Sequence, residues 1–398
     1  MPYKKNVLLG VTGGIAAYKI PNLASMLVKA GYNVDVIMTK NAVNFINPIT
    51  FETLTGNKCI VDTFDRNFQF NVEHVSLAKK TDVVMIAPAT ADVIGKIANG
   101  IADDMLTTTV LACKCKTFVS PAMNTRMFEN RIVQDNIEKL KKYGYEIIEP
   151  LNGWLACGDS GSGKMPEPKE LFQYILRETE CEKDLKGLKV CVTAGPTREA
   201  IDPVRFISNN STGKMGYAIA RRAMLRGAKV VLISGKTDLE KVPFVKNIDI
   251  LSAQDMYDAV IEEAKDSDVV IKAAAVADYK PDKVSDNKIK KKDGDMSISL
   301  TRTKDIIGTL GASKRAGMFL CGFSMETENM IENSKAKLEK KNLDLIVANN
   351  VKVKGAGFGT DTNVVTLISK DEILELPKMT KEEVADKLLD YIKAKIER

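Results

Sequence analysis

The chain opens the same structural unit twice, and this repetition constrains the fold more than any other feature. Its first residues read NVLLGVTGG, then the helix-patterned IAAYKIPNLASMLVKAGY, then the apolar run NVDVIMTK. From residue 188 onward, LKVCVTAGPT, a loop, YAIARRAMLRGA and KVVLISG repeat that order. A strand, a glycine-containing turn, a helix and a second strand begin the open α/β sheets that bind nucleotide-type ligands. We therefore expect two consecutive Rossmann-like sheets, each with its own ligand site.

The length of 398 residues supports this division, because single hydrophobic cores stop growing beyond about 250–300 residues. The segment PKELFQYILRETECEKDLKG is typical of a closing helix followed by a charged connector. We predict a first domain over residues 1–180, a linker over 181–187 and a second domain over 188–398.

Composition excludes several functional classes. The net charge of +6 is modest and aromatic residues make up only 6%, so a base-stacking nucleic-acid surface is not indicated. No apolar run approaches the ~20 residues of a membrane helix, and MPYKKNVLLG has no signal-peptide pattern. Seven irregularly spaced cysteines suggest reduced thiols and a cytoplasmic protein. A single histidine, His74, excludes a metal site built from several histidines.

The candidate ligand loops of the first domain follow its buried strands. The turn Thr12-Gly13-Gly14 precedes a helix and could attract a phosphate. It lacks both G-x-G-x-x-G and the P-loop pattern, so a turn that only packs strand on helix explains it equally well. TDVVMIAP and KTFVSPAMN are successive apolar runs that end in polar loops. Such strand ends border the ligand crevice of an open sheet, so we expect one site that includes residues 88–92.

Two other motifs are misleading. GDSGSGK satisfies a P-loop up to its lysine, but Met165 stands where a magnesium-binding hydroxyl belongs, no strand precedes the motif, and Pro166 and Pro168 follow. A flap is the better interpretation. Cys113 and Cys115 have no companion ligands in sequence, so a structural role is favoured over a metal site.

The second domain repeats the logic of the first at SDVVIKAAAVADY, where an apolar strand ends in small residues and an aspartate. The lysine-rich KIKKKDGD follows. A lysine run is usually a solvated loop, and the alternative is a mobile clamp for phosphates.

In order along nearly the whole chain, VTGGIAAYK, His74, APATAD, PAMNTRMF, ACGDSGSG, TAGPTREAIDPVRFISNNSTGKMG and AAVADY…KIKK resemble the motifs of one family. This is the bacterial bifunctional phosphopantothenoylcysteine decarboxylase / phosphopantothenate–cysteine ligase family of coenzyme A biosynthesis. The resemblance implies a flavodoxin-like flavoprotein domain followed by a nucleotide-binding domain. It also implies a homo-oligomer with a trimer-based decarboxylase and a dimeric ligase.

For the first domain the resemblance implies FMN as a transient oxidant in the decarboxylation of phosphopantothenoylcysteine. His74 matches the base, Asn124 the residue that holds the substrate carboxylate, and Cys157 the proton donor. Phe128 departs from the tryptophan usual in its motif. The matching FMN contacts are Gly13, Gly14, Ile15 and Thr39 for the phosphate, and Thr90, Ala91 and Asp92 for the ring.

For the second domain the resemblance implies that CTP activates 4′-phosphopantothenate as an acyl-cytidylate, which L-cysteine then attacks. Arg205 and Asn209 match residues that hold the acyl-cytidylate, and Lys288 matches the lysine needed for the cysteine step. Mg²⁺ is implied, with unknown ligands. Thr303-Lys304 and the Ser-Met after Phe323 depart from the usual motifs. The matching CTP contacts are Ala273, Ala274, Asp278, Lys288, Lys304, Asp305, Ile306, Ile307, Phe323, Lys337 and Lys341.

Two other classes of protein are the alternatives. An NAD-type oxidoreductase would need G-x-G-x-x-G and an acid at the end of the second strand, and neither half of the chain has them. A non-catalytic, decarboxylase-like flavoprotein that regulates a partner would generally lack the second domain. Flavin absorbance together with CTP-dependent pyrophosphate release would separate all three.

Overall fold

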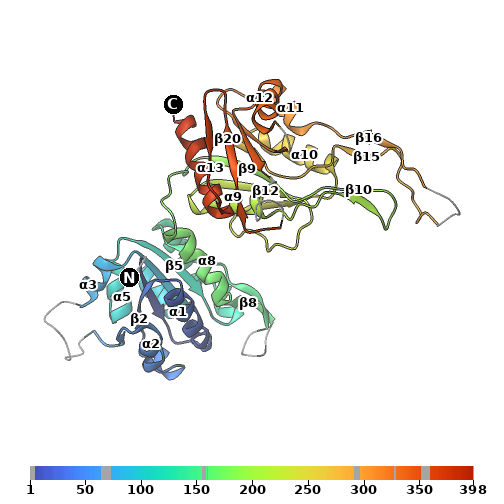
Figure 1. The fold of residues 1–398 in the computed structure, drawn as a ribbon. Coiled ribbons are helices and arrows are strands. Elements are labelled where there is room, and N and C mark those ends of the chain that lie inside the picture. Colours follow the sequence, from blue (N-terminus) through green and yellow to red (C-terminus); the bar gives the residue numbers. More distant parts are fainter. Residues whose placement is uncertain are drawn as a thin grey trace. The chain divides into compact units, whose positions relative to one another are not determined.

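The computed structural model describes residues 5–63, 73–154, 158, 160–290, 296–326, 329–350 and 359–397. Contacts within the chain divide it into two compact units, Met1–Cys181 and Glu182–Arg398. Each unit is built on its own open sheet (Figure 1). The expected fold class, two consecutive Rossmann-like α/β domains, is confirmed.

The first unit has a six-stranded parallel sheet in the order β3-β2-β1-β4-β5-β6. This is the Rossmann order and not the 2-1-3-4-5 order of flavodoxin itself. The strand order reverses between β1 and β4, so the crevice expected for a ligand lies at the carboxyl ends of these two strands. The strands are β1 (Asn6–Val11), β2 (Asn33–Met38), β3 (Cys59–Ile60), β4 (Val83–Ala89), β5 (Lys116–Pro121) and β6 (Glu146–Ile147).

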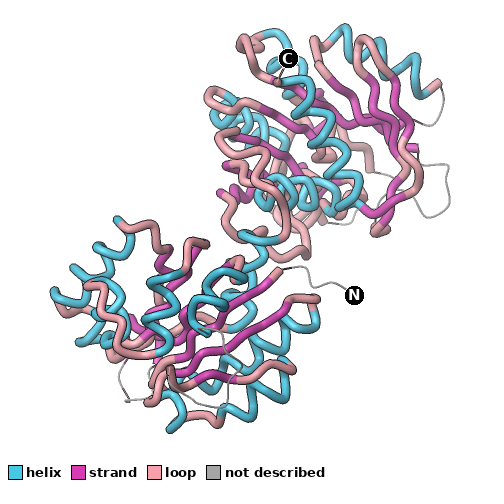
Figure 2. The backbone as a smooth tube through the Cα atoms, turned by 90° about the vertical axis from the view of Figure 1, so that its left-hand side faces the viewer, coloured by secondary structure: helices cyan, strands magenta, loops and turns pink. Residues whose placement is uncertain are grey.

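Helices cover both faces of this sheet, because its central strands carry apolar side chains on both sides (Figure 2). Along β1, Val7 and Leu9 pack on one face and Leu8 on the other, as the two-residue period of a strand requires. The first face is covered by α1 (Ile20–Lys29), α2 (Pro48–Thr55) and α8 (Pro168–Thr179). The second is covered by α3 (Glu73–Lys80), α4 (Ala91–Ala98), α5 (Met105–Ala112) and α7 (Arg131–Lys142).

Short elements border the carboxyl edge of the sheet. A 3-10 turn, η1 (Ile15–Lys19), leads from the β1 turn into α1, and α6 (Thr125–Phe128) follows β5. The GDSGSGK segment ends in a strand, β8 (Ser160–Lys164), which pairs antiparallel with β7 (Leu151–Trp154). The rejected P-loop motif is therefore part of a two-stranded ribbon. One further turn, η2 (Ala42–Asn44), follows β2.

The second unit has an eight-stranded sheet in the order β13-β12-β9-β14-β17-β18-β20-β21. The first six of these strands are parallel, and the last two, β20 and β21, are antiparallel. β9 and β14 occupy the positions that β1 and β4 hold in the first unit. The strands are β9 (Lys189–Ala194), β12 (Lys229–Ser234), β13 (Lys246–Asp249), β14 (Val269–Lys272), β17 (Phe319–Glu326), β18 (Leu345–Asn350), β20 (Val365–Ile368) and β21 (Ile373–Glu375).

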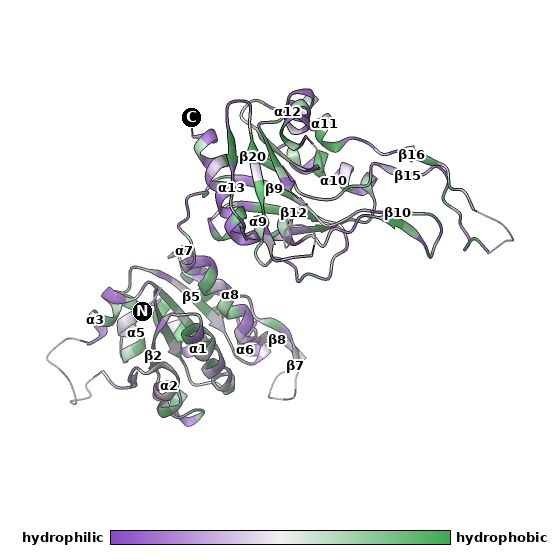
Figure 3. Cartoon of the chain, in the orientation of Figure 1, coloured by the Kyte–Doolittle hydropathy of each residue, from purple (hydrophilic) through white to green (hydrophobic). Residues whose placement is uncertain are grey.

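Among the described residues of this unit, five helices flank the sheet. A core cluster joins one face to α10 (Ala253–Ala264), α11 (Ile306–Ala312) and α12 (Met330–Lys340). On the other face, α9 (Lys214–Leu225) packs on β9 and β12 and against α13 (Lys381–Ile396). Figure 3 agrees with this layering, because β9 and β20 are green while α13 is largely purple. Among the described residues, no helix is long and apolar enough to cross a membrane.

Three short antiparallel ribbons complete the described part of the second unit. In Figure 1 the β15–β16 ribbon extends from the body of the unit as an arm, with β10 beside it. The ribbons pair β10 (Arg198–Ala200) with β11 (Phe206–Ser208), β15 (Tyr279–Pro281) with β16 (Leu300–Arg302), and β19 (Thr362–Asn363) with β22 (Met379–Thr380).

The start of the second unit is fixed to its body, because Leu185 is buried and its N–H donates to the Arg226 carbonyl.

Candidate functional sites

In the first unit a buried threonine joins the two strand ends at the reversal of strand order. Thr12 follows β1, and its hydroxyl donates to the Pro88 carbonyl at 2.7 Å. The same oxygen accepts the Thr90 N–H at 3.1 Å. Each such buried bond contributes about 0.5–1.5 kcal/mol. The glycine turn after β1 and the predicted ligand loop after β4 are therefore fixed to each other.

The two glycines of this turn have different structural requirements. A Cβ on Gly13 would lie 2.5 Å from the Asn41 Cβ, which is closer than real side chains approach. A Cβ on Gly14 would meet nothing nearer than a Thr90 methyl at 3.8 Å. Gly13 is thus required by packing against the loop after β2. Gly14 leaves the space in front of the turn open.

That space is part of a cavity of about 650 Å³. This volume is within the range of pockets that hold cofactors. Among the residues lining it, Lys19 forms an ion pair with Glu167 at 2.5 Å. Six residues predicted from the sequence line the cavity: Gly13, Gly14, Ile15, Thr90, Ala91 and Asn124. The cavity is also lined by residues that the sequence analysis did not assign to this site, among them Tyr18, Lys19, Met123, Met127, Trp154, Lys164, Met165 and Glu167.

Asn124 is held at the cavity by three neighbouring segments. Its side-chain oxygen caps α6 by accepting the Arg126 N–H at 2.9 Å. Just before it, the Ala122 N–H donates to the Ala89 carbonyl at 3.0 Å, and the Met123 N–H donates to the Gly163 carbonyl at 3.2 Å. The ends of β4, β5 and β8 thus jointly determine its position.

Four predicted residues of the first domain are not among those lining this cavity. Thr39 directly follows β2, and its N–H donates to the carbonyl of Val11 at the end of β1 at 3.0 Å. Asp92 is exposed on α4 and lies 3.5 Å from Lys96. His74 is in the first turn of α3. Cys157 lies outside the described residues.

In the second unit, buried threonine hydroxyls likewise join the two strand ends at the reversal of strand order. The buried Thr193, near the end of β9, accepts the Ala274 N–H at 3.1 Å. The buried Thr197 accepts the Ala277 N–H at 3.0 Å. The Asn209 amide adds a bond to the Ala275 carbonyl at 3.1 Å. Threonine hydroxyls and Asn209 therefore hold the AAAVAD loop in place.

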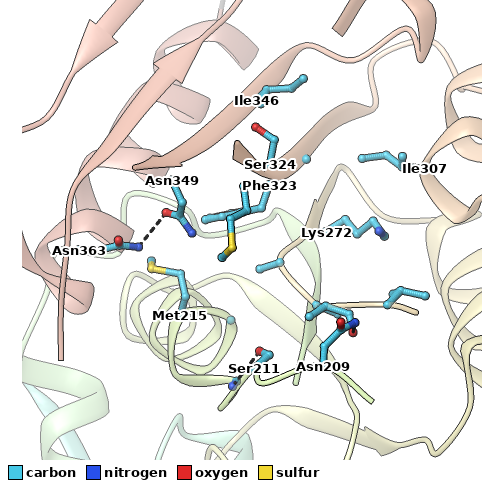
Figure 4. A pocket seen from close by; sticks show the side chains of 18 of the residues that line it. Asn209, Ser211, Met215, Lys272, Ile307, Phe323, Ser324, Ile346, Asn349 and Asn363 are labelled. Atoms are coloured by element: carbon cyan, nitrogen blue, oxygen red, sulfur yellow. Dashed lines mark hydrogen bonds between the residues drawn. The ribbon is translucent and has the colours of Figure 1, made fainter. Parts of the chain in front are cut away.

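Two adjoining cavities lie around this loop, and Figure 4 shows the larger one. Their volumes are about 390 Å³ and 320 Å³, and Lys272, Val276, Asp278 and Lys341 line both. Eight predicted residues line the larger cavity: Asn209, Ala273, Ala274, Asp278, Ile307, Phe323, Lys337 and Lys341. Lys304, Asp305 and Ile306 line the smaller one. Within the described part of the chain, neither cavity has Arg205 or Lys288 in its wall.

Lysines give these cavities a positive character that the sequence analysis only partly anticipated. Lys272 ends β14 and lines both cavities, and it has no hydrogen bond or ion pair with any described residue. Burial, and next the nearby Lys341, lower the pKa of Lys272 below its ordinary 10.5. Lys341 itself is paired with Asp305 at 3.0 Å. A lysine directly before AAAVAD, at the end of an apolar strand, was the signal that could have identified Lys272.

The start of α9 is a second feature that the sequence analysis did not assign to the site. The loop Ser211–Gly216 lines the larger cavity at the N-terminus of this twelve-residue helix. Gly213 has φ of 78°, and a Cβ there would lie 2.8 Å from Thr237. On the opposite wall, Asn363 donates to Asn349 at 2.9 Å, the upper dashed line in Figure 4.

Two Rossmann-like domains, each with a cavity at its reversal of strand order, define a two-site α/β enzyme of the nucleotide- and cofactor-binding class. Comparison with known families agrees. Residues 1–180 match the Flavoprotein family model, and residues 185–396 match the model of the DNA/pantothenate metabolism flavoprotein C-terminal domain.

Full-length relatives identify the family. The Coenzyme A biosynthesis bifunctional protein CoaBC of Bacillus subtilis (strain 168) is 48% identical over 394 residues, which are 98% of this chain and 97% of the relative. The protein of the same name from Haemophilus influenzae is 42% identical over 388 residues, again 98% and 97%. The chain belongs to the CoaBC family of bifunctional coenzyme A biosynthesis proteins, so the resemblance seen in the sequence is confirmed.

Among solved structures, the C-terminal domain of a CoaBC protein is 45% identical to this chain. The match covers 54% of this chain and 99% of the solved chain, with a TM-score of 0.47.

Proposed function

We propose that the two domains catalyse consecutive steps of coenzyme A biosynthesis. The C-terminal domain joins 4′-phosphopantothenate to L-cysteine at the expense of CTP. The N-terminal domain then decarboxylates the resulting phosphopantothenoylcysteine to 4′-phosphopantetheine with FMN. Besides family membership, one observation carries the proposal: the two cavities have different walls. The described wall of the second has five lysines and one aspartate, whereas that of the first has two lysines, one of them paired with Glu167, among glycines, an asparagine and apolar side chains.

The first cavity fits FMN. The space in front of Gly14 suits a phosphate, and the adjacent N–H groups at the start of η1 are the donors such a group needs. Thr90 and Ala91 would border the ring, and Asn124 would hold the substrate carboxylate. Bound FMN supplies a two-electron acceptor, which makes loss of CO₂ from a cysteinyl group feasible. The protein's own contribution is to orient the carboxylate, exclude water and move protons at His74 and Cys157.

A homo-oligomer accounts for the position of His74. Its side chain does not belong to the described wall of the cavity in the same chain, so a second copy would supply it. We therefore propose a decarboxylase whose sites lie between subunits, as the expected trimer-based assembly allows. A dimer of the ligase domains and a cytoplasmic location remain part of the same proposal.

The two adjoining cavities of the second domain fit a nucleoside triphosphate. The carboxylate of phosphopantothenate attacks the α-phosphorus of CTP, which forms the acyl-cytidylate and releases pyrophosphate. The cysteine amine then attacks the acyl carbon, which forms the amide and releases CMP. Lys272, Lys337 and Lys341 would neutralise charge on the phosphates. The loop before α9 would bind the phosphate of phosphopantothenate.

Mg²⁺ fits this site as a companion of the nucleotide. Among the described residues, no three His, Cys, Asp or Glu side chains are grouped to hold a metal. Mg²⁺ commonly needs only one or two carboxylates in addition to substrate phosphates. Asp278 and Asp305, which line the smaller cavity, are the carboxylates available.

The purified protein should test this function directly. It should show flavin absorbance, release pyrophosphate only when both CTP and 4′-phosphopantothenate are present, and form 4′-phosphopantetheine once cysteine is added. A colourless protein that reduces NAD would contradict the proposal. A yellow protein without CTP turnover would favour a regulatory flavoprotein.

Replacing Lys272 with methionine should weaken CTP binding. A hydrogen bond between charged groups contributes about 1.5–3 kcal/mol, so Kd for CTP should rise about tenfold or more. Bound phosphate favours the charged amine, whose pKa is lowered in the free protein. Affinity for CTP should therefore fall as pH rises toward 10.5 in the wild type, and less steeply in Lys272→Met.

Calorimetric titration with Mg·CTP at several pH values measures both effects. Lys265→Met is the matched control, because this exposed lysine pairs with Glu262 three residues before it and lines neither cavity of the site. Equal Kd values for wild type and Lys272→Met would remove Lys272 from the nucleotide site.

A further inference from the structure

The loop between β10 and β11 contains a buried carboxylate with an unusually complete set of partners. Asp202 is 3% exposed and accepts the N–H groups of Val204 and Arg205, each at 2.8 Å. It also accepts two guanidinium bonds from Arg205, at 3.0 Å from Nε and 2.6 Å from Nη2. These bonds, that of the Arg205 side chain first, hold the pKa of Asp202 well below its usual range.

The same pair binds a segment far along the chain. The Ile289 N–H donates to the Asp202 carboxylate at 3.1 Å, and the Ile289 carbonyl accepts Arg205 Nη2 at 2.9 Å. Both backbone polar groups of one residue are thus bound by one acid–base pair. Nearby, the Ser285 N–H donates to the Ile201 carbonyl at 3.1 Å. We call Asp202, Arg205 and the Ile289 backbone the clasp.

The clasp holds the residue next to Lys288. A lysine carries its charge at the end of a long flexible side chain. The region that this charge can reach therefore depends on where the backbone of the lysine is fixed. Lys288 has no described residue as a hydrogen-bond or ion-pair partner. The clasp therefore supplies the fixed backbone from which this lysine extends.

Direct binding of substrate by Arg205 fits the structure less well. Its guanidinium already makes three hydrogen bonds within the clasp. Beside the Asp202 carboxylate the pair is also neutral overall. It therefore adds little attraction for an anionic acyl-cytidylate.

We propose that Asp202 and Arg205 are positioning residues, which act on the reaction by fixing Ile289 and thereby placing Lys288 for the cysteine step. The inference rests on the proposed ligase function. It gives Asp202 a role, and it changes the role of Arg205 from substrate contact to support of the lysine.

The two half-reactions distinguish these roles. Single-turnover release of pyrophosphate from CTP and phosphopantothenate measures the first, and the later appearance of amide after cysteine addition measures the second. In Asp202→Asn and Arg205→Lys the first rate should stay within about twofold of wild type. The second should fall about tenfold to a hundredfold, the range for loss of a charged hydrogen bond, and acyl-cytidylate should accumulate.

Lys288→Met should stall at the same stage. Residues that act as one unit are non-additive, so Asp202→Asn combined with Lys288→Met should be no slower than Lys288→Met alone. Asp249→Asn is the matched control, because Asp249 forms an exposed ion pair with Lys241 at 2.5 Å. Flavin content and thermal unfolding of each variant show whether the fold is retained.

Two results would overturn the inference. One is a raised KM for phosphopantothenate with slowed pyrophosphate release in Arg205→Lys, which would mean direct substrate contact. The other is full additivity of the double variant. If the wild type itself released no pyrophosphate, the proposed function would fail instead.

Discussion

Replacement of His74 by glutamine should slow decarboxylation of phosphopantothenoylcysteine by about a hundredfold to ten-thousandfold, the usual contribution of a general base. His74 is the only histidine of the chain, so no other imidazole can replace it. Flavin absorbance should persist, because His74 is not among the residues lining the cavity that would hold FMN. CTP-dependent pyrophosphate release should be unchanged.

Release of CO₂ from the purified intermediate measures this effect. Ser76→Ala, an exposed change on the same helix, is the control and should decarboxylate normally. Mixing His74→Gln with a flavin-free variant should restore part of the activity if each site combines two copies of the chain. Wild-type turnover by His74→Gln would show that a different group removes the proton.

Replacement of Gly13 by alanine should weaken flavin binding. The new Cβ would lie 2.5 Å from the Asn41 Cβ and 3.0 Å from its backbone carbonyl carbon, so the turn itself must shift. Overpacking of this kind costs about 1–3 kcal/mol, which corresponds to about a fivefold to hundredfold loss of affinity. The isolated protein should be pale or colourless, with its ligase activity intact.

Visible absorbance and titration with FMN give the measurement. Gly95→Ala is the control, because a Cβ at this helical position meets nothing nearer than the Asn136 side chain at 3.7 Å. Full flavin occupancy in Gly13→Ala would mean that the turn does not contact the cofactor phosphate.

The sequence predicted the architecture well, because hydrophobic periodicity determines which segments pack in the core. TDVVMIAP and SDVVIK are β4 and β14, the strands beside each reversal of strand order. Once two sheets open in the same way, their ligand cavities must lie at corresponding strand ends. The individual residues came from the family resemblance, and eleven of those predicted in the second domain line its cavities.

The remaining site features depend on contacts that no local pattern encodes. Lys272 resembles any lysine at a strand end until the fold places Lys337 and Lys341 near it. The role of Asp202 depends on Ile289, which is 87 residues away. Asp92 is the last residue of the predicted ligand loop, yet it lies in the first turn of α4, where its carboxylate is 3.5 Å from Lys96. GDSGSGK resembles a phosphate loop only when its pairing with β7 is ignored.

The buried threonines at the two strand-order reversals have a further thermodynamic consequence. The hydroxyl groups of Thr12 and Thr193 accept hydrogen bonds from the loops that border the two cavities. In other proteins, ligand-binding loops commonly become ordered only when the ligand binds. Here the loss of conformational entropy is already part of folding. A cofactor or nucleotide that binds there would meet formed walls, and more of its contact energy would remain available as affinity.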